Sequence, residues 1–275
     1  LIWKMVKKVS ISDKIAVCII GCEDIAAKEL NGQKITLGRI QFTGRVKNFR
    51  TVSLIYELKN KITFTTASDI INGASQGFGL KKMLRIKCRR EGSHDFNSSD
   101  IEKAVGNELK NKGYETDFKN YEDTLYIDII GNICLVGKLI QENLGKREYR
   151  LRLSPDTINP CLAASVLFLI GLKKGETFLD PLCRDGILAI EASYFTSKVY
   201  AFGRDVYSAR INAKIGKRKI SFGNYDLDWL TTKFDENSVD KIAAYLPSIS
   251  KRRKNVVQLY RKFFHAVSCV LRGKL

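Results

Sequence analysis

The chain has 275 residues, and its 47 lysines and arginines outnumber its 29 aspartates and glutamates, which gives a formal net charge of +18 at pH 7. This length is sufficient for two or three compact units with buried cores. The chain contains no run of about eighteen uninterrupted apolar residues, which excludes an ordinary membrane-spanning helix.

The positive charge favours a polyanionic partner, because neutralisation of phosphates is the sequence-independent part of nucleic-acid binding. The alternatives are a basic surface for an acidic protein and adaptation to an unusual cytosol. We favour nucleic acid because the lysines and arginines occur in clusters. The N-terminus lacks a secretory pattern. Since the chain begins with Leu1, the sequence leaves open whether the natural start lies further upstream.

The cysteines and histidines predict neither disulfides nor a metal site. The seven cysteines are an odd number without a Cys-x-x-Cys spacing, and several lie in apolar segments. This usage is typical of reduced core residues in a cytosolic protein, so we expect a cytoplasmic location. His94 and His265 are far apart in the chain, and we expect no metal centre.

Strands and helices alternate in the first part of the chain. We expect strands at 14–21, 39–46 and 61–67, and helices at 22–32 and 48–60. The second helix is predicted because Val52, Ile55 and Tyr56 have helical spacing. This order predicts a small ferredoxin-like α+β unit, and the Gly- and Ser-rich segment 71–79 marks its boundary.

The segment 83–96 alternates strictly between apolar and basic side chains. Such alternation predicts a strand with one face in the core and a basic stripe on the other face. The apolar positions are Leu84, Ile86 and Cys88, and the basic positions are Arg85, Lys87 and Arg89.

A helix and a hairpin follow this strand. We expect Ser98 or Ser99 to cap a helix that ends at Gly113. Segments 124–130 and 133–140 predict a hairpin around a Gly-Asn turn. The polar, cationic and proline-containing segment 141–160 is typical of an interdomain linker.

From Pro160 onward, helices and strands alternate regularly. Helices are expected at 161–172, 187–195, 206–216 and 255–271, and strands at 176–180, 198–205, 219–226 and 239–247. This order predicts a parallel sheet with helices on both faces. The domains are therefore expected at 1–70, 71–145 and 146–275.

Three aspartates end apolar strands of the predicted parallel sheet, at Asp180, Asp205 and Asp226. Parallel strands bring their carboxyl ends to one edge, and ligands bind outside that edge. An acidic residue after the second strand, here Asp205, can accept hydrogen bonds from both hydroxyls of a ribose. The sequence therefore predicts a site for a nucleotide-type cofactor at this edge.

Three stretches, in the same order, resemble one family. GCEDIAAKEL (21–30) is similar to the family's opening motif, and RREGSHDFNSSDIEKAVG (89–106) resembles the THUMP signature. DPLCRDGILAIEAS (180–193) is similar to DPxCGSGTIxIEAA. From about Ile15 to its last residue, the chain resembles the THUMP-domain RNA methyltransferases. These join a ferredoxin-like unit and a THUMP domain to a Rossmann-fold methyltransferase that uses S-adenosylmethionine (AdoMet).

The resemblance implies methyl transfer from AdoMet to a guanine exocyclic amine in tRNA or rRNA. The THUMP domain of such enzymes helps to dock the RNA near the acceptor end of tRNA, so tRNA is the partner that we expect. The family pattern assigns the ribose to Asp205 and the adenine amine to Asn224 and Asp226. The full expected cofactor set is Asp180, Pro181, Cys183, Gly186, Asp205, Asn224 and Asp226.

The cofactor loop departs from the family pattern. Where similar enzymes have Cys-Gly-Ser-Gly, this chain has Cys183, Arg184, Asp185 and Gly186. Glycine permits close approach of the backbone and a positive φ, so the two charged side chains either narrow the loop or swing outward. A Rossmann-like shell without a ligand is the alternative to a cofactor site.

The loop after the fourth strand departs further. Similar enzymes carry (N/D)PP(Y/F), whose polar groups orient the target amine while the aromatic ring stacks on the flipped base. The corresponding residues here are Tyr245, Leu246, Pro247 and Ser248, so Tyr245 and Pro247 are the expected catalytic residues. The alternative is that Tyr245 only packs at a strand end. Because similar enzymes continue past this region, we expect the Rossmann-like domain to lack its last strands, in a fragment or by natural truncation.

The expected RNA-binding cations form three clusters, for which an ordinary solvated face is the alternative. They are Arg85, Lys87, Arg89 and Arg90; Arg147 and Arg150; and Lys251, Arg252 and Arg253. Two hypotheses of function stay open at this point. One is an AdoMet-dependent RNA guanine-N2 methyltransferase or a fragment of one, and the other is a non-catalytic RNA-binding protein with a degenerate methyltransferase domain. A scaffold for another nucleotide is a third possibility, without a feature of its own.

Overall fold

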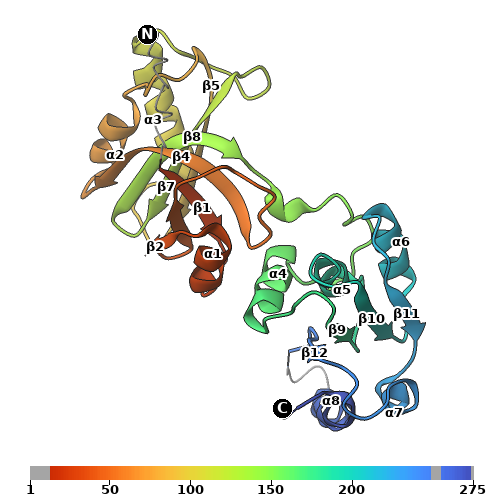
Figure 1. Ribbon diagram of the computed structural model, residues 1–275. Helices are drawn as coiled ribbons and strands as arrows, with labels where there is room; N and C mark the ends of the chain where they lie inside the picture. Colours follow the sequence, from red (N-terminus) through yellow and green to blue (C-terminus); the bar gives the residue numbers. More distant parts are fainter. Residues whose placement is uncertain (1–12, 249–254, 274–275) are drawn as a thin grey trace, which may run out of the picture. The chain divides into compact units, whose positions relative to one another are not determined.

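The computed structural model describes residues 13–248 and 255–273, and the chain divides into two compact units between Leu144 and Gly145 (Figure 1). No helix in the part of the chain that the structure describes is long and apolar enough to cross a membrane.

The first unit is built on one eight-stranded sheet with the order β2-β3-β1-β4-β8-β7-β5-β6. Its elements are β1 (Lys14–Cys18), α1 (Glu23–Leu30), β2 (Gln33–Thr36), β3 (Arg39–Phe42), β4 (Val52–Thr63), α2 (Ala67–Ala74), β5 (Met83–Glu91), α3 (Ser98–Asn111), β6 (Glu115–Thr116), β7 (Asp123–Ile130) and β8 (Ile133–Gln141). A single 3₁₀ turn, η1 (Leu144–Lys146), follows. The boundary that we expected at residue 70 lies inside α2, and the sheet runs across it, so a division within this unit stays a prediction.

The helix expected at 48–60 is wrong, because residues 52–63 form the long strand β4. The separate strand expected at 61–67 is also wrong, because residues 61–63 are the end of β4 and Ala67 begins α2. β4 lies between β1 and β8 in the sheet, and its two faces belong to two buried clusters, one with Val52 and Ile55 and the other with Tyr56. Val52, Ile55 and Tyr56 are all fully buried, but on two faces of a strand rather than on one face of a helix. A central strand buried on both sides loses the alternation by which a strand is recognised.

The part of the first unit from β5 to β8 follows the predicted pattern more closely. The alternating segment forms β5, and β7 and β8 form the antiparallel hairpin. Asn97, rather than Ser98 or Ser99, is the N-cap of α3, where its side chain and that of Asp100 form a capping box. The segment 71–79, expected as a boundary, contains the second half of α2.

A buried ion pair lies within the sheet of the first unit. The guanidinium of Arg39 donates to both carboxylate oxygens of Asp128, from Nε and Nη2, each at 2.6 Å. Tyr56 Oη also donates to Asp128, at 3.1 Å. Both charged side chains are fully buried, so each depends on the other for compensation of its lost hydration.

The second unit contains a four-stranded parallel sheet with the order β11-β10-β9-β12. Its elements are α4 (Pro160–Leu169), β9 (Thr177–Asp180), α5 (Ile187–Ala192), β10 (Lys198–Gly203), α6 (Tyr207–Ile215), β11 (Ser221–Asn224), η2 (Leu227–Trp229), α7 (Leu230–Lys233), β12 (Lys241–Ile242) and α8 (Val256–Val270). The predicted alternation of strands and helices is therefore confirmed.

Both faces of this sheet are covered, with α4, α5 and α6 on one side and α7 and α8 on the other (Figure 1). Phe178 of β9 packs in the core against α4, α5 and α6, whereas its neighbour Leu179 packs in the core formed with α7 and α8. This alternation of neighbouring apolar residues explains why the strands are apolar throughout.

The strand expected at 239–247 is shorter than predicted. Only Lys241 and Ile242 form β12, and the amide of Ala243 makes one more hydrogen bond to the carbonyl of Leu179, at 3.2 Å. β9 ends at Asp180, and none of the described strands pairs with the residues that follow Ala243. Residues 244–248 therefore form a loop at the carboxyl edge of the sheet.

Candidate cofactor site

A cleft lies at the carboxyl edge of the parallel sheet, where β9, β10 and β11 end. It consists of two cavities of about 630 Å³ and about 310 Å³. The residues that line both are Leu182, Gly203, Arg204 and Leu259, so the two cavities are neighbours. Volumes of this size are typical of sites for small molecules and cofactors.

The loop after β9 is held close to the end of β10. The amide of Cys183 donates to the carbonyl of Phe202 at 2.7 Å, and a Cβ at Gly203 would collide with the carbonyl oxygen of Cys183. Gly186 has φ +81°, and a Cβ there would lie 2.9 Å from Cβ of Ala209. Glycine is therefore needed at both places, for close approach at Gly203 and for positive φ at Gly186.

The two charged residues that replace glycine and serine in this loop turn in different directions. Asp185 turns inward and is buried, and its carboxylate accepts hydrogen bonds from the amide and the hydroxyl of Ser154 at 3.2 and 3.4 Å. Arg184 turns outward, donates to the carbonyl of Asp156 at 3.1 Å and lies 5.7 Å from the ring centre of Tyr245. The loop therefore leaves the smaller cavity open, with Arg184 in its wall.

Asp180 lies beneath the cleft rather than in its wall. Its side chain is buried, and it accepts a hydrogen bond from the amide of Leu182 at 3.2 Å. Burial raises the pKa of Asp180 to about 7, and the nearby charge of Asp185 adds to this effect. The burial of the neighbouring Cys183 likewise raises the pKa of its thiol well above the ordinary value, so this thiol is inert.

Asp205 and Asp226 are exposed at the edge of the sheet. Asp205 lines the smaller cavity and accepts a hydrogen bond from the amide of Tyr207 at 2.8 Å through Oδ1. Asp226 lines the larger cavity, where Arg204 donates to its Oδ2 from two nitrogens at 3.0 and 3.2 Å. Asn224 ends β11 but is not among the described residues that line either cavity.

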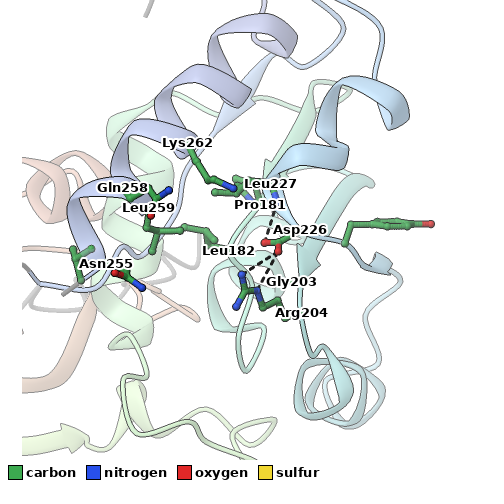
Figure 2. Close-up of a pocket in the computed structure, with 12 residues that line it drawn as sticks. Pro181, Leu182, Gly203, Arg204, Asp226, Leu227, Asn255, Gln258, Leu259 and Lys262 are labelled. Carbon is green, nitrogen blue, oxygen red and sulfur yellow. Dashed lines mark hydrogen bonds and ion pairs between the residues drawn. The ribbon is translucent and has the colours of Figure 1, made fainter. Parts of the chain in front are cut away.

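One wall of the larger cavity comes from α8, which the sequence analysis did not connect with the site. Figure 2 shows Gln258, Leu259 and Lys262 of this helix facing Pro181 and Leu227. Arg204 was also missed, although it directly precedes Asp205. No motif marks the α8 residues, because an amphipathic helix that packs on a sheet has the same pattern whether or not it borders a ligand.

The expected catalytic residues lie in the loop after β12. Tyr245 is 41 % exposed and lies beside Arg184. Pro247 lines the smaller cavity, and its carbonyl accepts a hydrogen bond from the hydroxyl of Tyr260 of α8 at 3.1 Å. The structure thus brings both residues to the same edge of the sheet as Asp205.

The basic stripe on β5 is partly neutralised by carboxylates. Glu142 accepts hydrogen bonds from Arg85 at 2.8 Å and from Lys87 at 2.9 Å. Arg89 forms an ion pair with Glu91. Burial alone would raise the pKa of Glu142, but the hydrogen bonds from the two cations outweigh it, so the pKa is lowered.

The other expected RNA-binding residues are placed differently. Arg90 belongs by its position in β5 to the opposite face from the stripe, and it donates to the carbonyl of His94 at 3.1 Å. Arg147 is buried in an ion pair with Glu191 at 3.0 Å, and Arg150 is half-buried. Lys251, Arg252 and Arg253 lie outside the described residues.

The side chains of the cleft suit an adenosyl compound. Asp205 supplies an acceptor for ribose hydroxyls in the smaller cavity, and Leu182 and Leu227 supply apolar surface in the larger one. Gly203 lets the cofactor loop and the end of β10 meet without a side chain between them. The residues present in the cleft therefore fit AdoMet. Among residues 13–248 and 255–273, no group of three or more His, Cys, Asp and Glu side chains could hold a metal ion.

Two family models match the chain in sequence order. The model described as "THUMP domain" matches residues 67–160, and the model described as "RMKL-like, methyltransferase domain" matches residues 147–232. The chain has the domains of a THUMP-domain methyltransferase. The match to the methyltransferase model includes residues 183–186, Asp205 and Asp226, and it ends before α8.

The curated relatives of this chain agree with the two family models. A tRNA (guanine(6)-N2)-methyltransferase of Thermus thermophilus is 27 % identical over 201 residues, which cover 70 % of this chain and 58 % of the relative. An enzyme of the same name from Archaeoglobus fulgidus is 27 % identical over 65 % of this chain and 52 % of its own length. The human U6 snRNA (guanine-N(2))-methyltransferase THUMPD2 is 22 % identical over 66 % of this chain and 38 % of its own length. The chain thus spans little more than half of the first two relatives.

Solved structures have the same fold. TrmN from Thermus thermophilus superposes with a TM-score of 0.72 at 24 % identity, over 94 % of this chain and 85 % of that one. The structure of SMU.472, solved in complex with SAH, superposes with a TM-score of 0.70 at 18 % identity, over 94 % and 86 % of the two chains. The mixed α/β fold predicted from the sequence is therefore confirmed.

Proposed function

We propose that this chain binds AdoMet in the cleft at the carboxyl edge of β9, β10 and β11 and transfers its methyl group to guanine N2 in RNA, with tRNA as the favoured substrate. The observation that carries the proposal is the open cleft beside Asp205 in a methyltransferase domain that follows a THUMP domain. The names of the relatives support guanine N2 as the target atom.

In this proposal, each residue of the cleft has a simple task. The carboxylate of Asp205 accepts hydrogen bonds from the ribose hydroxyls, while Leu182 and Leu227 exclude water from one side of the adenine. AdoMet, when bound, supplies an electrophilic methyl group on a positively charged sulfur. Asp180 is a positioning residue, because it holds the amide of Leu182 beneath the cleft.

The loop after β12 is assigned to the target base. The half-exposed ring of Tyr245 can stack on a flipped guanine, since base stacking needs only an accessible aromatic face. The carbonyl of Pro247 has one lone pair left beyond the hydrogen bond from Tyr260, and that lone pair can accept a hydrogen bond from the target amine.

The first unit is assigned to RNA docking. Lys87 and Arg89 are the exposed cations of the stripe on β5, and we infer that they contact phosphates. A cytoplasmic location is in keeping with the seven cysteines, all of which are free.

A second candidate function is RNA binding without methyl transfer. It is favoured because residues of the proposed site already interact with each other. Arg204 forms an ion pair with Asp226, and the guanidinium of Arg184 lies over the ring of Tyr245. The replacement of the family's short polar residue by Tyr245 points in the same direction.

Transfer of a labelled methyl group from AdoMet to unmodified bulk tRNA separates the two candidates. The proposal predicts incorporation of label and recovery of N2-methylguanine after digestion of the RNA. Binding of AdoMet and tRNA without incorporation would favour the second candidate. Transfer to U6 snRNA but not to tRNA would retain the chemistry and correct the substrate.

A further inference from the structure

Arg184 is a cation in the wall of the proposed cofactor cleft, at a place where the family motif has glycine. Its side chain is 26 % exposed, and it lines the smaller cavity together with Asp205, Ser208 and Pro247. Hydrogen bonds fix the loop on both sides of Arg184. The amide of Cys183 donates to the carbonyl of Phe202 in β10, and the buried carboxylate of Asp185 accepts from the amide of Ser154. The structure therefore places Arg184 among the residues that line the cavity, on a loop held at both sides.

The smaller cavity thus has a negative group and a positive group in the same wall. Asp205 suits the hydroxyls of a ribose, whereas an arginine suits a carboxylate or a phosphate, which its planar fork can bind through two nitrogens. AdoMet carries a ribose and, at its amino-acid end, a carboxylate. No other part of AdoMet is an anion, so this carboxylate is the group that matches Arg184.

We propose that Arg184 binds the carboxylate at the amino-acid end of the cofactor, so that the cleft selects adenosyl compounds that carry this group. The inference rests on the proposed function. It assigns a binding role to the residue that departs most from the family motif.

The present partners of Arg184 leave this role open. The ion pair with Asp156, at 3.2 Å, and the hydrogen bond to the carbonyl of Asp156 both use Nη1. An arginine has five N–H donors, so Nη2 and Nε provide three more. The carboxylate of Asp156 offsets the charge of the guanidinium, which limits repulsion of the positively charged sulfur of AdoMet.

The test compares AdoMet with decarboxylated AdoMet, which lacks only the carboxylate, in calorimetric titrations of the full chain without RNA. The wild type is expected to prefer AdoMet by about tenfold or more, as for other charge-assisted hydrogen bonds. In Arg184→Ala the preference is expected to fall to about threefold or less.

Arg272→Ala is the matched control. Arg272 also pairs with a carboxylate, Asp240 at 2.7 Å, and donates to a backbone carbonyl, that of Asn237 at 3.1 Å, but it lines neither of the two described cavities. This variant is expected to retain the wild-type preference. Arg184→Gln is the second variant, for use if the alanine variant does not fold, and the same loss of preference is expected.

The outcomes separate this inference from the proposed function. Equal binding of the two compounds by the wild type, or a preference that survives removal of Arg184, would overturn the carboxylate assignment and leave AdoMet binding intact. A wild-type chain that binds neither compound would refute the proposed function together with the inference.

Discussion

At the scale of single residues, the three aspartates that end strands have three different environments. Asp205 is exposed in the wall of the cleft, Asp226 is paired with Arg204, and Asp180 is buried beneath the loop. Their common position after a strand was predictable from the sequence, because parallel strands end at one edge. Their environments were not, because these depend on the direction in which Arg204 and Asp185 turn.

Asp205→Asn tests the proposed ribose contact. The neutral amide is expected to weaken AdoMet binding by about tenfold, because it replaces a charge-assisted hydrogen bond with an ordinary one. Calorimetry measures the effect. Asp235→Asn, on the segment that precedes β12, is the control and is expected to bind like the wild type. Wild-type affinity in Asp205→Asn would contradict the assignment.

Asp180 is expected to make the second unit less stable as the pH rises. Its folded-state pKa of about 7 lies above the ordinary 3.8, so the folded state holds the proton more tightly than the unfolded state. The stability that this group contributes is full below the ordinary pKa and is lost as the pH rises through about 7.

Asp180→Asn should remove this pH dependence and keep the hydrogen bond from Leu182, because an amide oxygen can accept it. Denaturant titration from acidic to mildly alkaline pH measures the free energy of unfolding of the second unit. As the pH rises, this free energy should fall in the wild type relative to the variant. Parallel curves for the two proteins would show that Asp180 is not buried as a neutral acid.

At the scale of elements, the regular alternation in the second unit made the strands and helices predictable from the sequence. The spacing of apolar residues gave a wrong prediction for β4, because burial on both faces produced an apparent helical spacing of Val52, Ile55 and Tyr56. The contribution of α8 to the cleft could not be predicted either. Its residues have no motif, and only the tertiary fold brings them to the ends of β10 and β11.

The basic face of β5 carries the prediction on RNA binding. Lys87→Glu combined with Arg89→Glu should weaken tRNA binding and reduce the slope of log affinity against log salt by about one unit for each lost phosphate contact. Filter binding at several salt concentrations measures both quantities.

Lys103→Glu combined with Lys110→Glu on α3 is the matched control, because α3 covers the opposite face of β5. Both double variants change the net charge by the same amount. An equal loss of affinity in the two would therefore mean that only the overall charge attracts RNA. An unchanged salt slope in the β5 variant would refute phosphate contact at this face.

At the scale of the whole molecule, the chain consists of two units with separate cores. The Arg39–Asp128 pair joins strands that are 89 residues apart in sequence, and no local pattern predicts such a pairing. Arginine and aspartate are mostly exposed in proteins and are rarely fully buried unless they are paired. Together Arg39 and Asp128 are the most deeply buried charges of the first unit.

Arg39→Met should destabilise the first unit by about 3–5 kcal/mol, because it leaves the carboxylate of Asp128 buried without its partner. Hydrogen exchange should show lost protection in β1, β3, β4 and β7, with protection retained in β9 and β10. Arg45→Met, at an exposed position, is the control. Full protection of the first unit in Arg39→Met would contradict the account of this pair.

The most direct test of the central claim is a calorimetric titration of the purified chain with AdoMet. We expect saturable binding at one site per chain. The absence of heat at millimolar AdoMet, with the protein folded, would contradict it.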